Sequence, residues 1–233
     1  MNPARRGPTA LASSLLAILG LMAVLAAGAQ ANWLVEGKEL TTNETVAVSA
    51  HTPWTLTIPA KNIQFRCTTA ASEELKLLAK SATAEGKVKY TGCTAFSPPG
   101  AEGKEQKNCK PKEPIVTGAI TLITLHNGKS YLLEEPNTLG GKFSTIEVSE
   151  LCALTESNDL TGKQVLECGQ LVSSVFVQVD CSTLNISTLE TVTSETLFPL
   201  DTLKFGANSA TISGIIKLSL SGANAGKTWA GEV

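Results

Sequence analysis

The chain has 233 residues, of which 42% are hydrophobic, 17% charged and 5% aromatic. Its 19 basic and 21 acidic residues give a formal net charge of −2, and Arg66 is the only arginine beyond Arg6. This balance lacks the clustered basic residues with which nucleic-acid-binding proteins neutralise phosphates, so we expect no nucleic-acid partner. The length suits one large β domain or two small ones.

The first 31 residues have the pattern of a secretory signal peptide. Arg5 and Arg6 form a charged start, residues 11–28 are an apolar run, and residues 29–31 match an A-x-A cleavage site. We therefore expect a mature chain of residues 32–233 that is secreted or on the cell surface. Retention of the apolar run as an N-terminal anchor is the alternative. No later run reaches the roughly 20 apolar residues that span a bilayer, so no membrane span is expected after signal cleavage.

Beyond this segment, apolar residues recur with a period of two, which is typical of strands with one packed face and one wet face. Glycine, proline, asparagine and serine separate the runs. The pattern predicts an all-β fold, an antiparallel sandwich or barrel of about a dozen strands. The clearest alternating runs are residues 45–49, 54–58, 87–90, 117–125, 142–148, 175–179 and 210–220.

Three segments carry more specific signals. Residues 72–82 are compatible with a helix capped by Ser72 or with a strand. Asn127-Gly128 predicts a type I′ turn that joins residues 120–125 and 130–133 in a hairpin. Residues 97–114 contain four prolines and several lysines, a composition that predicts a disordered loop.

The cysteines constrain the domain organisation. A faint repeat of a strand–turn–strand pattern allows two sub-domains with a boundary near residues 136–141. All six cysteines follow the signal segment, so we expect three disulfides. Three cysteines lie on each side of the boundary, and therefore at least one bridge must cross it. The connectivity that we favour is Cys93–Cys109, Cys168–Cys181 and Cys67–Cys152.

The sequence shows no recognisable catalytic, cofactor or metal site. The two histidines, His51 and His126, lie in predicted strand-edge or turn positions and have no nucleophile motif beside them. No cysteine pair has zinc-site spacing, and the carboxylate runs lack the pattern of a calcium loop. We therefore assign no catalytic residue, cofactor or metal ligand.

A glycan-active hydrolase is one alternative, because glycoside hydrolysis requires only two carboxylates on a rigid scaffold. Glutamates near predicted strands are Glu147, Glu150, Glu156 and Glu167. Glu147 and Glu150 would point to opposite faces of a strand, as would the adjacent Glu134 and Glu135. A catalytic pair would therefore have to come from different strands.

Two other regions suggest partners. Residues 104–112 are the only basic cluster in the sequence of the mature chain and could contact an anionic cell-wall polymer. The 97–114 loop could instead contact a protein partner, which would make the chain a secreted inhibitor or adhesin. Trp33 and Trp229, near the two ends of the mature chain, are expected to close a sheet together as core residues.

Three short motifs carry a resemblance. The segments WLVEGK at residues 33–38, FRC at 65–67 and YTGC at 90–93 resemble uncharacterised secreted β proteins of high-GC Gram-positive bacteria. The resemblance implies an exported bacterial protein and carries over no functional residue. Together with the composition, it leads us to expect a non-catalytic binding or structural module of the bacterial exterior.

Overall fold

The computed structural model describes residues 32–137, 140–149, 152, 154, 157–182, 187–194 and 200–232. The predicted signal peptide lies outside the described residues, and residues 31–233 form one unit. The elements of the described residues are β1 (Asn32–Val35), β2 (Lys38–Glu39), β3 (Glu44–Ala50), β4 (Trp54–Ile58), the 3-10 helix η1 (Pro59–Lys61), β5 (Ile63–Leu77), β6 (Thr83–Ser97), β7 (Lys104–Glu105), β8 (Ile115–His126), β9 (Lys129–Pro136), β10 (Lys142–Glu147), β11 (Ser157–Thr161), β12 (Gln164–Val172), β13 (Val175–Val179), β14 (Thr188–Thr193), β15 (Lys204–Phe205), β16 (Asn208–Ser209), β17 (Thr211–Ser213), β18 (Ile216–Leu220), the 3-10 helix η3 (Gly222–Asn224) and β19 (Trp229–Glu232).

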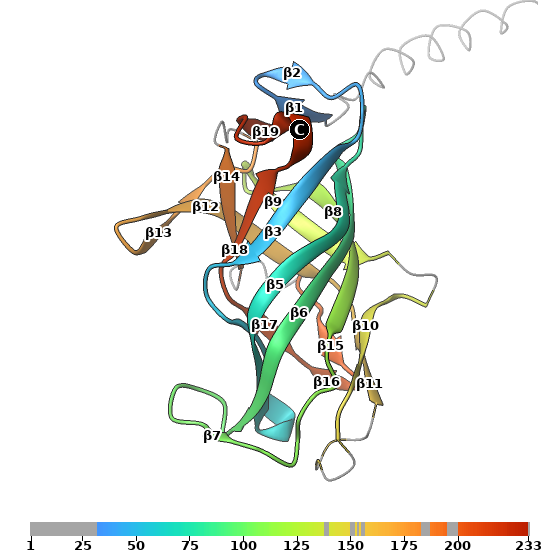
Figure 1. Cartoon of the computed structure of the whole chain (residues 1–233), viewed down its shortest axis with the longest axis vertical. Helices are drawn as coiled ribbons and strands as arrows, with labels where there is room; N and C mark the ends of the chain where they lie inside the picture. Colours follow the sequence, from blue (N-terminus) through green and yellow to red (C-terminus); the bar gives the residue numbers. More distant parts are fainter. Residues whose placement is uncertain are drawn as a thin grey trace, which may run out of the picture. The chain divides into compact units, whose positions relative to one another are not determined.

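Eight of these strands close into an antiparallel barrel (Figure 1). Around the barrel they follow in chain order: β3, β5, β6, β8, β9, β12, β14 and β18. The last strand pairs with the first, from Ile216 opposite Ala50 to Leu220 opposite Val46. The all-β antiparallel prediction is confirmed, and of the two expected architectures the chain adopts an up-and-down barrel.

A bulge and a glycine bend the wall of the barrel. The β5–β6 register shifts between Glu73 and Lys76, and Glu74 has a φ of 58°. At Gly86 on β6, a Cβ atom would lie 2.3 Å from the Cα atom of Leu75. Only glycine therefore allows β6 to approach the bulge, and such bulges increase the curvature that barrel closure needs.

Two smaller sheets lie at opposite ends of the barrel (Figure 1). The first, β19–β1–β2, brings the buried Trp33 and Trp229 to a ring-centroid distance of 5.9 Å. The expected closing of a sheet by these two tryptophans is confirmed. The second, β10–β11–β15–β16, packs Phe205 against Phe65 of β5 at a centroid distance of 6.0 Å.

One of three local predictions is confirmed in full, one in part, and one is wrong. The Asn127-Gly128 turn is confirmed, because both residues have positive φ and His126 pairs with Lys129. Residues 72–77 continue strand β5, so the strand alternative holds for this part of the 72–82 segment. The 210–220 run is not one strand. It divides into β17, which pairs with β4, and β18, which joins the barrel.

The 97–114 segment is ordered, contrary to the predicted disordered loop. Glu113 accepts hydrogen bonds from the backbone N–H groups of Gly92 and Cys93, both at 2.8 Å. The Arg66 guanidinium donates to the carbonyl of Gly100 and lies 4.5 Å from the centroid of the Phe96 ring. Polar contacts with β5 and β6 thus stabilise a segment that has few apolar side chains of its own.

All six cysteines form disulfides, as expected, but two predicted pairs are wrong. Cys168–Cys181 is confirmed, whereas the predicted Cys93–Cys109 and Cys67–Cys152 are replaced by Cys67–Cys93 and Cys109–Cys152. The reason is the strand register, which places Cys67 of β5 directly opposite Cys93 of β6. The Cys109–Cys152 bridge crosses residues 136–141, so the inference that one bridge must cross is confirmed.

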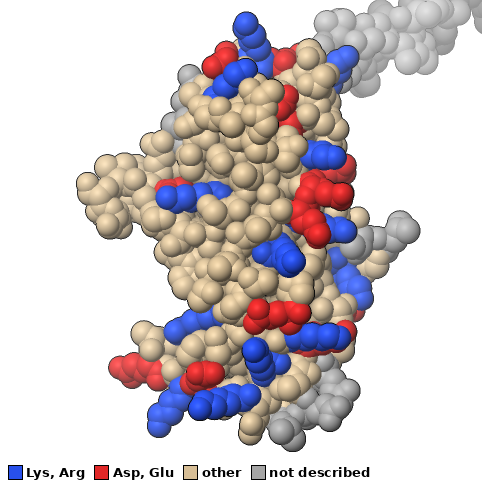
Figure 2. Space-filling model, viewed as in Figure 1, with Lys and Arg blue, Asp and Glu red and all other residues tan. Residues whose placement is uncertain are grey.

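The face of the molecule that Figure 2 shows is uneven in charge. Hairpin β12–β13 projects from the barrel and exposes Val172, Val175 and Val177, whose side chains make up an apolar tip. Charged side chains gather instead near the end that carries β7, and along the edge opposite this hairpin.

Candidate functional site

The interior of the barrel contains a cavity between its two end sheets. The centre of a water molecule can occupy about 80 Å³ of this space. A cavity of this size has room for several non-hydrogen atoms, because one buried water occupies a probe volume of only about 10–15 Å³. Trp33 and Trp229 lie at one end of the lining, and Phe143 and Leu160 of the second sheet lie at the other.

The alternating pattern of the strands produces the lining. Every second residue of a strand faces inward, and each barrel strand contributes at least two such residues. They are Val46 and Val48, Leu75 and Leu77, Ala84, Gly86, Val88 and Tyr90, Thr117, Ala119 and Thr121, Leu132 and Glu134, Gln164 and Leu166, Thr191 and Thr193, and Ile216 and Leu218. The cavity is therefore mainly apolar, with its polar side chains on β6, β8, β9, β12 and β14.

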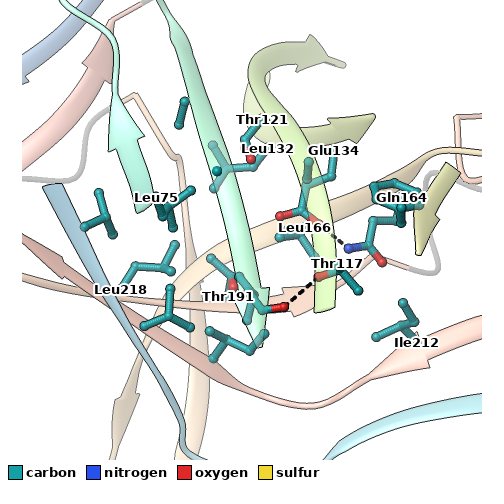
Figure 3. Close-up of a pocket in the computed structure, with 18 of the residues that line it drawn as sticks. Leu75, Thr117, Thr121, Leu132, Glu134, Gln164, Leu166, Thr191, Ile212 and Leu218 are labelled. Atoms are coloured by element: carbon teal, nitrogen blue, oxygen red, sulfur yellow. Dashed lines mark hydrogen bonds between the residues drawn. The ribbon is translucent and has the colours of Figure 1, made fainter. Parts of the chain in front are cut away.

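The most polar part of the lining is a cross-strand pair on β9 and β12. Glu134 lies directly opposite Gln164, and the Gln164 Nε2 group donates a hydrogen bond to the Glu134 carboxyl (Figure 3). Burial raises the pKa of Glu134 above its usual range, and the hydrogen bond from Gln164 opposes this shift only in part. The pair thus places one carboxyl group in an apolar enclosure.

Tyr90 on β6 adds a second ionisable group to the lining. Burial and the neighbouring Glu134 carboxylate raise the pKa of the Tyr90 hydroxyl far above its ordinary value, while a hydrogen bond with Thr117 opposes the shift. The Tyr90 ring stacks on Trp54 with a centroid distance of 4.5 Å. Tyr90 is therefore a neutral group that is held in a fixed position.

Two polar atoms of lining residues have no hydrogen-bond partner among the described residues. They are the Oε1 atom of Gln164 and the Nε1 atom of Trp229, and both are buried. By contrast, the Nε1 group of Trp33 donates to the carbonyl of Thr83 at 2.9 Å. A buried polar atom without a partner costs free energy, and a bound molecule with a matching group would remove this cost.

The acidic residues that the sequence suggested lie apart from one another. Glu134 faces the cavity, whereas Glu135 contacts Lys163, so the predicted divergence of these two neighbours is confirmed. Glu147 is exposed and pairs with Lys112 at 2.9 Å. Glu167 accepts a hydrogen bond from the hydroxyl of Ser194 at 2.8 Å. Glu150 and Glu156 lie outside the described residues.

The histidines and the basic segment considered from the sequence lie away from the cavity lining. His51 is exposed in the turn between β3 and β4, and His126 ends strand β8 at the hairpin turn. Within the basic 104–112 segment, Lys112 belongs to the ion pair with Glu147. The described residues contain no cluster of three or more side chains suited to bind a metal ion.

Sequence reasoning identified neither the Glu134–Gln164 pair nor the cavity. The available signal was the alternation of residues 130–136, which places Leu132 and Glu134 on the same face of a strand. A glutamate on the packed face of a strand is unusual and could have marked an interior site. Its partner Gln164 depends on the pairing of β9 with β12, which the sequence does not specify.

Comparison with known proteins gives no further assignment. No protein-family model, no curated protein and no solved structure matches the chain. Within the part of the chain that the structure describes, we find no helix of sufficient length and apolarity to cross a bilayer.

Proposed function

We propose that this protein is an exported, non-catalytic binding module of the bacterial exterior that holds a small hydrophobic molecule inside its barrel. The observation that carries the proposal is the mainly apolar cavity inside the barrel, with unpaired polar atoms in its lining. Small-molecule sites have this combination of apolar walls and a few polar groups, and eight-stranded barrels are wide enough to hold one small ligand.

Separate observations support the proposed compartment. Three disulfides favour an oxidising environment, and the first 31 residues have the pattern of a signal peptide. The resemblance of the 33–38, 65–67 and 90–93 segments to secreted proteins of high-GC Gram-positive bacteria supports a bacterial exterior location.

The proposal predicts measurable binding of a small apolar probe, for which we choose hexan-1-ol. Burial of six carbon atoms at about 0.8 kcal/mol each corresponds to a dissociation constant on the order of 0.1–1 mM. Isothermal titration calorimetry measures the affinity. All three tryptophans, Trp33, Trp54 and Trp229, line the cavity, so their fluorescence should change with the same concentration dependence.

A filled cavity should not bind the probe. Ala119 lies on the inner face of β8, and Ala119→Leu should weaken hexan-1-ol binding at least tenfold, because the added side chain occupies the space. Ala71→Leu on β5 is the matched control, since Ala71 is exposed, and it should bind as the wild type does. Equal binding by both variants, or none by the folded wild type, contradicts the proposal.

A further inference from the structure

Resting on the proposed function, we infer that the Glu134–Gln164 pair recognises the ammonium group of a hydrophobic amine, whose carbon chain occupies the apolar part of the cavity. The inference concerns the headgroup of the ligand. The inference rests on the hydrogen-bonding groups and charges that are present in the cavity lining and on those that are absent from the described lining residues.

The hydrogen-bonding groups of the pair favour a ligand that donates hydrogen bonds. Gln164 directs its Nε2 group at the Glu134 carboxyl and leaves its Oε1 atom buried without a partner. Gln164 is also the one hydrogen-bond partner that the described residues give to the Glu134 side chain. The pair thus presents an amide oxygen and a carboxyl group, both of which can accept hydrogen bonds. An ammonium group has three N–H donors, whereas an alcohol has one.

The charge of the lining points to a cation. Among the described residues that line the cavity there is no lysine, arginine or histidine, and Glu134 is the single carboxylic acid. An ionised ligand carboxylate would therefore meet Glu134 with no compensating positive charge. An ammonium group would instead form a buried ion pair with Glu134 that also has hydrogen bonds, which is the condition under which buried charges are tolerated.

The rest of the lining suits a short hydrocarbon chain. Leu75, Leu132, Leu166, Ile216 and Leu218 surround the remaining space, and Figure 3 shows Leu132 and Leu166 beside the Glu134–Gln164 pair. Because the cavity has room for several non-hydrogen atoms, we choose a primary amine of about six carbons as the probe.

Three probes with one chain length test the headgroup: hexylamine, hexan-1-ol and hexanoate, titrated calorimetrically at pH 7.5. We expect hexylamine to bind at least tenfold more tightly than hexan-1-ol, because charge-assisted hydrogen bonds are the stronger ones. Hexanoate should bind most weakly. Binding of hexanoate as tight as that of hexylamine would overturn the inference.

Two substitutions on neighbouring positions of β9 give the matched comparison. Glu134→Gln should reduce hexylamine affinity at least tenfold and change hexan-1-ol affinity less than threefold. Glu135→Gln, which alters the carboxyl group that contacts Lys163, should leave both affinities unchanged. Gln164→Leu removes the unpaired acceptor and should also weaken hexylamine binding, so the test stands if Glu134→Gln does not fold.

The outcomes separate the two proposals. If hexan-1-ol binds but hexylamine binds no more tightly, the amine inference fails and the proposed hydrophobic binding stands. If none of the three probes binds to the folded protein, both fail. If Glu134→Gln and Gln164→Leu both retain full hexylamine affinity, the pair is not the recognition site and the inference is rejected.

Discussion

At the scale of single residues, Glu134 makes stability dependent on pH. Burial raises the pKa of this carboxyl in the folded protein, so the folded state holds the proton more tightly than the unfolded state does. The resulting stabilisation is complete below the unfolded glutamate pKa of about 4.3, and it is lost as the pH rises through the folded pKa.

Replacement of this residue isolates the effect. Glu134→Gln cannot ionise, so its free energy of unfolding relative to wild type should increase with pH above about 4.3 and level off once the folded wild-type carboxyl has ionised. Urea unfolding between pH 4 and pH 8 without ligand measures the difference. A difference that does not change across this range contradicts a raised pKa of Glu134 in the folded protein.

At the scale of elements, the bulge in β5 depends on the glycine opposite it. Gly86→Ala would place a Cβ atom 2.3 Å from the Cα atom of Leu75, and a backbone atom cannot move aside as a flexible side chain can. We expect a loss of stability of about 3 kcal/mol or more from the resulting strain, measured by urea unfolding.

Gly128→Ala is the control for this prediction. Gly128 also has a positive φ, but a Cβ atom there would meet nothing within 4 Å. This substitution should cost only the conformational strain of a left-handed residue, about 1–2 kcal/mol. If Gly86→Ala lowers the free energy of unfolding no more than Gly128→Ala does, the close approach of Gly86 to Leu75 does not determine the curvature of the barrel wall.

At the scale of the whole molecule, the sheet β19–β1–β2 contributes both to stability and to the cavity. Trp229 is 4% exposed and packs against Trp33. Trp229→Ala should lower the free energy of unfolding by about 3–5 kcal/mol. Val175→Ala at the 64% exposed hairpin position should change it by less than about 0.5 kcal/mol. Thermal unfolding followed by circular dichroism distinguishes the two, and equal effects would contradict this role of Trp229.

The sequence predicts the strands in which apolar and polar residues alternate. It does not predict which residues of different strands lie opposite one another. Residues 45–49, 54–58 and 117–125 show the period of two that their strands require, and Asn127-Gly128 specifies its turn chemically. The Cys67–Cys93 bridge and the Glu134–Gln164 pair depend instead on register between strands. The order of the 97–114 segment depends on contacts with Gly92 and Cys93, which its own composition does not reveal.

The barrel can close between β3 and β18 only late in synthesis of the chain. The hydroxyl of Ser221 donates to the carbonyl of Thr45, a residue 176 positions earlier, and β18 is the last of the eight barrel strands to leave the ribosome. Until then β3 and β14 have unpaired edges, which favour association with other chains. Such distant pairing also slows folding. A chain without β18 therefore has an open interior, and a molecule can be retained there only after β18 has paired with β3.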